Sequence, residues 1–181
     1  MDRADRIRLL INRHARLDAA LMRSPRLNAA QVIALDYLAN ANRFSRSPSH
    51  VAEYLGTTRG TMSQTLKSLE AKGYVTEERL PDDRRSIRYQ VTEAGREALR
   101  MSNVEQSALT ALPDADLASL ERLLSHWLVH RVERTGTRMF GICRDCRHHD
   151  PQPNGRRYCR LLRIELTREE AEQLCHEHAP A

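Results

Sequence analysis

The chain has 181 residues, which suits one ordinary domain with an appendage, and 40% of them are hydrophobic, too many for a disordered chain. Aromatic residues make up only 4%, a composition that favours helices over a β-sandwich. The net charge of +5 favours an anionic partner such as nucleic acid, since clustered Lys and Arg release counterions from phosphate.

The sequence also bears on the cellular compartment. No apolar run approaches the roughly 18 residues that a membrane span requires. Residues 1–16 are charged throughout rather than signal-like. We therefore expect a cytoplasmic protein without membrane contact, in which clustered cysteines are more typical of a metal or redox site than of structural disulfides.

Apolar periodicity and capping residues predict a mainly helical chain with one hairpin. The first expected elements are a long helix that ends near Ser24-Pro25, a helix at 28–41, a short helix that opens with Ser47-Pro48 and ends at Gly56, and a helix at 58–72. Two extended stretches are expected at 74–80 and 86–92. They are followed by a helix from Thr92 to about Leu112 and by a helix at 114–134 that ends at Gly136. We place a domain boundary after residue 136, where Cys, His, Arg and Pro replace the aliphatic residues.

Two short helices joined by a tight turn and followed by a hairpin outline a winged helix-turn-helix. The second of these helices carries polar residues at i, i+3, i+4 and i+7 on its outer face. Small residues there allow close approach, hydroxyl and amide groups suit base edges, and a lysine suits phosphate. A polar face is often merely solvated, but the adjacent hairpin favours DNA binding. The candidate DNA-binding residues of this helix are Thr58, Arg59, Gly60, Thr61, Ser63, Gln64 and Lys67.

The hairpin adds Arg84, Arg85 and Arg88 as candidate DNA-binding residues, because guanidinium groups can enter a narrow minor groove. Asp82 and Asp83 oppose these charges, which is typical of a solvated turn, although Asp83 could also hold one arginine through an ion pair.

These residues resemble the MarR family of bacterial regulators, whose pattern couples a serine-containing recognition helix and "LE-x-K-G" to a wing that ends in "LT-x-x-G". The matching strings are TMSQTLKSLEAKGYV at 61–75, DDRRS at 82–86 and VTEAG at 91–95. Val91 stands where leucine is usual, and the wing is shortened before Asp82. The resemblance spans about Arg3 to Arg134 and leaves the C-terminal tail outside.

The resemblance implies a homodimer whose N- and C-terminal helices intertwine and place two recognition helices on a pseudo-palindromic operator. It also implies repression of transcription that a small-molecule ligand relieves. Independently of the family, the first helix and the segment from Leu117 to Leu128 carry more aliphatic surface than one small lobe is expected to bury, which supports a dimer.

All four cysteines lie in the tail, and their spacing predicts a metal site. They are Cys143, Cys146, Cys159 and Cys175. A Cys-x2-Cys turn brings two thiolates to one metal, and two more distant cysteines complete a tetrahedron, for which zinc is the first choice. The tail has few aliphatic residues, so a metal would supply part of its stability.

Alternatives remain open for the metal and for the function. The same cysteines could hold an iron-sulfur cluster or act as redox-sensing thiols, and a histidine among His148, His149, His176 and His178 could replace one of them. No constellation assigns catalytic roles, so we expect no enzymatic activity. A protein-interaction adaptor that uses a winged helix without binding DNA is the alternative of another class. The fold class expected is therefore mainly α, with a winged-helix DNA-binding and dimerisation domain at 1–136 and a small four-cysteine metal-binding module at 137–181.

Overall fold

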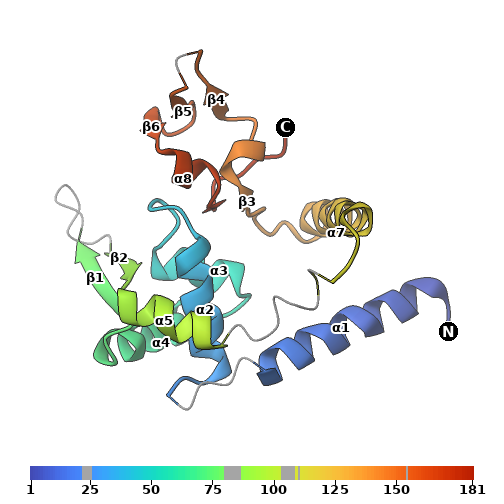
Figure 1. Cartoon of the computed structure of the whole chain (residues 1–181), viewed down its shortest axis with the longest axis horizontal. Helices are drawn as coiled ribbons and strands as arrows, with labels where there is room; N and C mark the ends of the chain where they lie inside the picture. The colour runs from blue at the N-terminus through green and yellow to red at the C-terminus, as the bar shows by residue number, and fades with distance from the viewer. Residues whose placement is uncertain (22–25, 80–86, 103–108, 110, 154) are drawn as a thin grey trace.

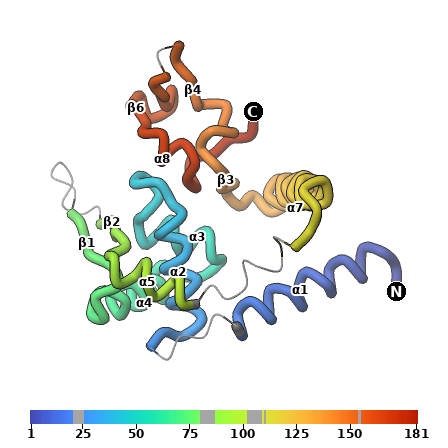
Figure 2. The backbone as a smooth tube through the Cα atoms, in the orientation of Figure 1, coloured from blue at the N-terminus to red at the C-terminus, as the bar shows by residue number. Residues whose placement is uncertain are grey.

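The computed structural model describes residues 1–21, 26–79, 87–102, 109, 111–153 and 155–181. Within these ranges the chain is mainly helical, and its short strands form small separate sheets (Figure 1). The N-terminus lies at the free end of a long helix, and the C-terminus lies beside the cysteine-rich part of the chain (Figure 2). The prediction of a mainly helical winged-helix fold is confirmed.

The winged-helix lobe comprises α2 (Ala29–Asn40), α3 (Pro48–Tyr54), α4 (Arg59–Ala71), β1 (Val75–Arg79), β2 (Ile87–Val91) and α5 (Glu93–Ser102). Asn28, Ser47 and Thr58 cap the first three of these helices, each side chain accepting a hydrogen bond from the backbone N–H three residues later. The strands pair antiparallel, with Val75 opposite Val91. The predicted helix starts at 28, 47 and 58 are thus confirmed.

The core of this lobe forms where α2, α3, α4 and the hairpin meet. Its fully buried side chains include Val32, Leu35, Leu38, Val51, Leu66, Leu69, Val75 and Tyr89. Because Met62, Leu66 and Leu69 turn the apolar face of α4 inward, the opposite face of the helix is directed to solvent.

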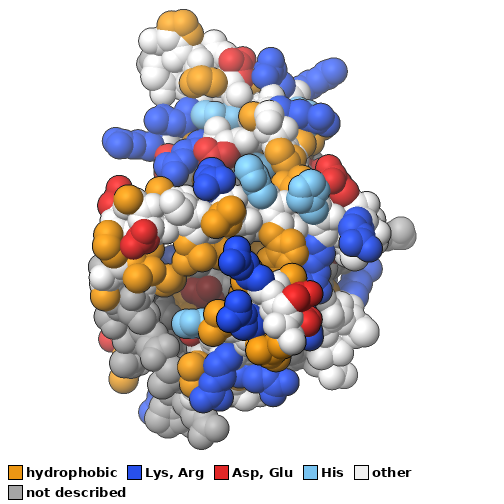
Figure 3. Space-filling model, turned by 90° about the vertical axis from the view of Figure 1, so that its right-hand side faces the viewer, with side chains coloured by type: hydrophobic (Ala, Val, Ile, Leu, Met, Phe, Trp, Pro, Cys, Tyr) orange, Lys and Arg blue, Asp and Glu red, His pale blue; other side chains and the backbone are white. Residues whose placement is uncertain are grey.

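Two long helices, α1 (Arg3–Leu21) and α7 (Asp114–Thr135), stand beside the lobe (Figure 1). Helix α7 buries none of its residues, and Gly136 ends it with a positive φ of 63°, as predicted. Hydrophobic side chains gather on the face of the molecule shown in Figure 3. The exposed large apolar residues of the two helices are Ile7, Leu9, Leu10, Leu17, Leu120, Leu123, Leu124, Trp127 and Leu128.

The cysteine module, residues 141–181, follows α7 and packs on the lobe near α3 (Figure 1). It contains β3 (Gly141–Ile142), η1 (Cys143–Asp145), β4 (His149–Pro151), β5 (Arg157–Cys159), β6 (Ile164–Leu166), α8 (Arg168–Ala171) and β7 (Leu174–Cys175). Strand β3 pairs with β7, and β4, β5 and β6 form an antiparallel meander. A capping box formed by Thr167 and Glu170 starts α8.

In the part of the chain that the structure describes, no helix is both long and apolar enough to cross a membrane.

Candidate nucleic-acid interface and cysteine cluster

The outer face of α4 presents most of the predicted DNA-binding residues to solvent. Gly60, Gln64 and Lys67 are exposed, and Ser63 between them is half-buried. Arg59 and Thr61 are exposed at the start of the helix. These side chains form one polar surface because α4 directs its apolar residues into the core.

The N-terminus of α4 is organised by two threonines. The Thr58 side chain accepts a hydrogen bond from the backbone N–H of Thr61, and the two hydroxyl oxygens are 2.9 Å apart. The first turn contains no acidic residue, so the positive end of the helix dipole and Arg59 act together. This end of α4 is therefore suited to an approaching phosphate.

Arg88, predicted to lie near the hairpin tip, is on strand β2. Arg88 is half-buried on β2, and its guanidinium carbon lies 5.7 Å from the centre of the Phe44 ring. The neighbouring Tyr89 donates its backbone N–H to the carbonyl of Arg46 at 3.0 Å. Arg84 and Arg85 lie outside the described residues.

The four cysteines are free thiols, and all are buried. Cys143, Cys159 and Cys175 pack in one apolar cluster with Leu166. Cys143 begins η1, and the N–H of Cys146 donates to the Cys143 carbonyl at 3.1 Å, which closes the turn between the first two cysteines. We call these four residues the cysteine cluster.

The cysteines are close enough to influence one another electrostatically. Burial raises the pKa of Cys143 to about 12, and the thiols of Cys175, Cys159 and Cys146 act in the same direction. The sulfur of Cys146 also accepts a hydrogen bond from the backbone N–H of Ala179 at 3.4 Å. Within the described ranges, no group of three or more His, Cys, Asp or Glu side chains is arranged so that it could hold a metal ion.

Hydrogen bonds from the winged-helix lobe reach Cys175. Burial raises the pKa of this thiol, whereas hydrogen bonds from Asn42, from the backbone of Glu177 and from Ser45 lower it. Asn42 and Ser45 are themselves almost completely buried, at 1% and 0% exposure. The lobe therefore contributes polar groups to the surroundings of the cluster.

The histidines of the tail take different positions. The ring of His176 stacks on that of His50 from α3, with the ring centres 3.5 Å apart. The Nε2 atom of His176 lies 3.0 Å from a carboxylate oxygen of Glu177. The buried Nδ1 atoms of His50, His176 and His178 lack a hydrogen-bond partner. The same holds for Nε2 of His149. Burial lowers the pKa of both His50 and His176 to about 4.

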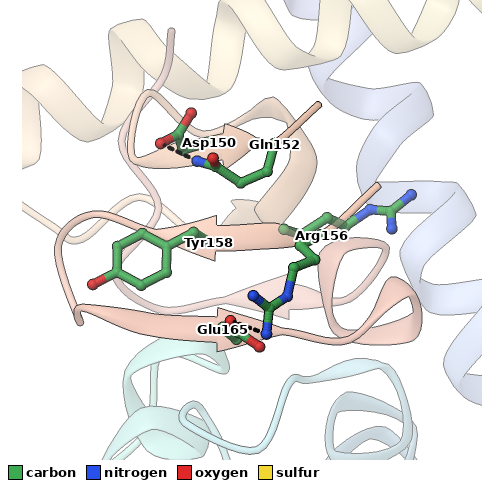
Figure 4. Close-up of a pocket in the computed structure, with 6 residues that line it drawn as sticks. Asp150, Gln152, Arg156, Tyr158 and Glu165 are labelled. Atoms are coloured by element: carbon green, nitrogen blue, oxygen red, sulfur yellow. Dashed lines mark hydrogen bonds and ion pairs between the residues drawn. The ribbon is translucent and has the colours of Figure 1, made fainter. Parts of the chain in front are cut away.

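A pocket of about 350 Å³ lies on the β4–β5–β6 sheet (Figure 4). Its charged and amide groups pair among themselves. Arg156 contacts Glu165 at 2.7 Å, and Gln152 donates to Asp150 at 2.8 Å. The pocket takes no residue from the outer face of α4 or from the cysteine cluster.

The MarR family model matches this chain over residues 27–86. The match covers the lobe from the start of α2 to the hairpin, about a third of the chain. Members of that family are transcription regulators and not enzymes. No curated protein matches the chain at a significant level.

Solved structures of such regulators share the fold. A MepR–DNA complex from S. aureus has a TM-score of 0.55 at 17% identity, covering 72% of this chain and 98% of that one. Apo MarR from E. coli has a TM-score of 0.53 at 21% identity, covering 71% and 98%. CouR from Rhodococcus jostii RHA1, bound to p-coumaroyl-CoA, has a TM-score of 0.54 at 20% identity, covering 67% and 90%. At these identities the likeness establishes the fold, and it leaves more than a quarter of this chain without a counterpart.

The residues that the sequence did not single out lie in the α2–α3 loop, residues 41–46. Phe44 of this loop packs against the cysteine cluster, and Asn42 and Ser45 contact the chain around Cys175. In the sequence, Asn42 and Ser45 indicate only the end of a helix. Because the contacting residues are about 130 positions apart in the sequence, no local pattern predicts the contact.

Proposed function

We propose that this protein is a sequence-specific, double-stranded DNA-binding transcriptional regulator that acts as a cytoplasmic homodimer, as a repressor. The observation that carries this proposal is the exposed outer face of α4, where Gly60, Gln64 and Lys67 lie in line on the recognition helix of a winged-helix fold. One protein of the same fold, MepR, has been solved in complex with DNA.

The apolar faces of α1 and α7 support the homodimer. Trp127 is 42% exposed and Leu123 is 56% exposed in a helix that buries no residue in the single chain. Large exposed apolar patches are uncommon on monomeric proteins and often mark an interface. A second copy of the chain would cover both helices and set the spacing of two recognition helices.

Selection of duplexes from a random library by the purified protein tests DNA binding. We expect enrichment of an inverted repeat with half-sites about one helical turn apart. Failure to enrich any duplex at low salt would favour the protein-interaction adaptor instead.

Substitutions on α4 then separate the roles of its residues. Lys67→Ala should weaken binding equally for all duplexes and reduce the slope of log affinity against log salt by about 1. Gln64→Ala should instead relax preference at one base position, at a cost of about 1–3 kcal/mol on the selected site. Arg122→Ala, on the exposed surface of α7, is the matched control and should change neither. From the sequence we also propose that Arg84 and Arg85 contribute to the salt-dependent term.

We further propose that one zinc ion draws Cys143, Cys146, Cys159 and Cys175 together as its ligands, since the side chains of the described residues do not by themselves form a metal site. The support is the chemistry of the donor set: four buried free thiols, a closed Cys-x2-Cys turn, and an N–H donor directed at the sulfur of Cys146. An iron-sulfur cluster on the same cysteines is the alternative.

Metal analysis of anaerobically purified protein, with its visible absorption spectrum, tests the zinc site. We expect a colourless protein with about one zinc per chain. Brown protein that contains iron and sulfide would replace zinc with an iron-sulfur cluster, and absence of any metal would leave the thiols as a redox site.

A small-molecule effector completes the proposal. CouR was solved with p-coumaroyl-CoA bound, and 6-hydroxynicotinic acid regulates DNA binding of BpsR from Bordetella bronchiseptica, which has the same fold with a TM-score of 0.51. We propose that a ligand of this kind, or a change at the cysteine cluster, relieves repression here.

A further inference from the structure

The α2–α3 loop joins the cysteine cluster to the elements that would contact DNA. Its first half is bound to the tail: the N–H of Asn42 donates to the carbonyl of Leu174 at 2.9 Å, and Ala41 forms a parallel bridge with the same residue. On the other side of Cys175, the N–H of His176 donates to the Ser45 hydroxyl at 2.9 Å. The backbone on both sides of Cys175 is therefore held by the loop.

Two further contacts join the loop to the cysteine module. The Phe44 ring packs against the cluster that contains Cys143, Cys159 and Cys175. Arg43 forms an ion pair of 2.9 Å with the buried carboxylate of Glu170. The loop and the cysteine module are thus joined by an ion pair as well as by an apolar contact.

The same loop contacts the wing and leads into α3. The carbonyl of Arg46 accepts the N–H of Tyr89 on β2 at 3.0 Å, and Arg88 on the same strand faces the Phe44 ring. The loop ends at Ser47, which is the N-cap of α3. Val51 of α3 lies in the same lobe core as Leu66 of α4. A shift of the loop would therefore reach both the wing and the recognition helix.

We propose that Asn42 and Ser45 are positioning residues for Cys175 as a metal ligand, and that metal at the cysteine cluster holds the α2–α3 loop and the wing strand in the DNA-binding arrangement. DNA affinity then depends on metal occupancy. This inference rests on the proposed DNA binding and on the proposed metal site. By linkage, DNA must raise the affinity for metal by the same factor by which metal raises the affinity for DNA.

The test uses the full-length protein in four states: loaded with Co²⁺ or stripped by chelator, each with and without a fluorescent duplex from the selection described above. We expect stripping to weaken DNA binding at least tenfold, and DNA to tighten Co²⁺ binding by the same factor. Circular dichroism checks that the stripped protein keeps the helices of the winged-helix lobe, whose core is separate from the cluster.

Ser45→Ala tests the connection itself. Because it removes a group that supports a ligand, we expect about 10- to 100-fold weaker Co²⁺ binding and a coupling factor closer to one. Ser119→Ala, on exposed α7, is the control and should keep both values. The measurements on the unsubstituted protein decide the question even if Ser45→Ala does not fold.

Loaded and stripped protein with equal DNA affinity would overturn the coupling and leave the proposed DNA binding intact. Loaded protein that binds no duplex would overturn the proposed function as well. A chain that takes up no Co²⁺ would overturn both the metal site and its coupling to DNA.

Discussion

Gly95 shows how closely the lobe is packed at a single residue. A Cβ atom there would lie 2.3 Å from the backbone oxygen of Tyr74 and 2.9 Å from a methyl carbon of Val91. These contacts are too short, and a backbone oxygen cannot rotate away as the end of a side chain can. Only glycine lets the start of α5 approach the hairpin in this way.

We predict that Gly95→Ala lowers the free energy of unfolding by about 1–3 kcal/mol, because the backbone must shift to accept the methyl group. Urea denaturation measures the change. Gly60→Ala is the control, since its Cβ would meet only Thr58 Oγ1 at 3.9 Å. If both variants unfold at the same urea concentration, the close approach at Gly95 is not a constraint.

His50 gives the molecule a pH dependence. Burial lowers its pKa to about 4, with smaller effects in the same direction from His176, Arg138 and Arg88, and an opposing one from Glu177. The unfolded chain binds a proton on this residue near pH 6.5, whereas the folded chain does not. Stability is therefore unaffected by His50 above about pH 6.5 and falls as the pH drops from there towards 4.

We predict that His50→Phe reduces the loss of stability between pH 6.5 and 4.5. Thermal unfolding of both proteins across this pH range, at one saturating zinc concentration, measures the loss of stability. Cysteine protonation is then common to both proteins. His126→Phe, on the exposed surface of α7, should keep the original dependence. An unchanged slope in His50→Phe would show that another group takes up the proton.

At the scale of the element, the caps determine where helices begin. Helix α2 starts with a capping box in which the Asn28 side chain accepts the N–H of Gln31 at 2.9 Å and Gln31 accepts the N–H of Asn28 at 3.2 Å. Lys72, at the end of α4, also donates to Gln31 and to the carbonyl of Arg26. The start of α2 and the end of α4 are thereby joined.

We predict that Asn28→Ala costs about 0.5–2 kcal/mol of stability, because it removes this cap. Asn28→Ser should restore most of the loss, since its hydroxyl can accept the same hydrogen bond. Chemical denaturation of the three proteins provides the comparison. A serine variant as unstable as the alanine variant would mean that the cap oxygen is not the cause.

The elements with a strong local signal could be predicted from the sequence. Helices α2, α3 and α4 begin where Asn28, Ser47 and Thr58 predicted them, because a cap depends only on residues within one turn. The strands of the cysteine module could not be predicted, since each is only two or three residues long and carries no alternation.

The candidate site could be predicted only in part. The outer face of α4 follows from helical periodicity, whereas the contact of Arg88 with the Phe44 ring could not be predicted. The four cysteines were recognised by spacing, but the loop that supports Cys175 was not. Asn42 and Ser45 act through tertiary contacts, which neither propensity nor periodicity records.

At the scale of the whole molecule, the proposed homodimer would cover the exposed apolar residues of α1 and α7. At 100° per residue, Trp127 lies on the apolar side of α7, and the exposed Ser125 lies about 160° away from it around the helix. We predict that Trp127→Asp converts a dimer of 20.8 kDa chains to a monomer, because a charge in the apolar interface is not compensated. Sedimentation velocity measures the mass.

Loss of the dimer should also weaken binding to a two-site operator by about 100-fold or more, since the second half-site no longer benefits from effective concentration. Ser125→Asp adds the same charge outside the apolar face and should remain a dimer that binds DNA. A dimeric Trp127→Asp protein would place the interface elsewhere.

The hydrogen bond from Asn42 to Leu174 joins residues 132 positions apart. At about 5–20 residues per second, the ribosome makes the second of them roughly 7–26 s after the first. Helices α2 to α5 can fold during that interval, but the loop before α3 receives its partner in the tail only after Leu174 has been made. A nascent chain thus carries its recognition helix for seconds before Asn42 is bound to the tail, and the proposed coupling between the cysteine cluster and the wing can form only after that interval.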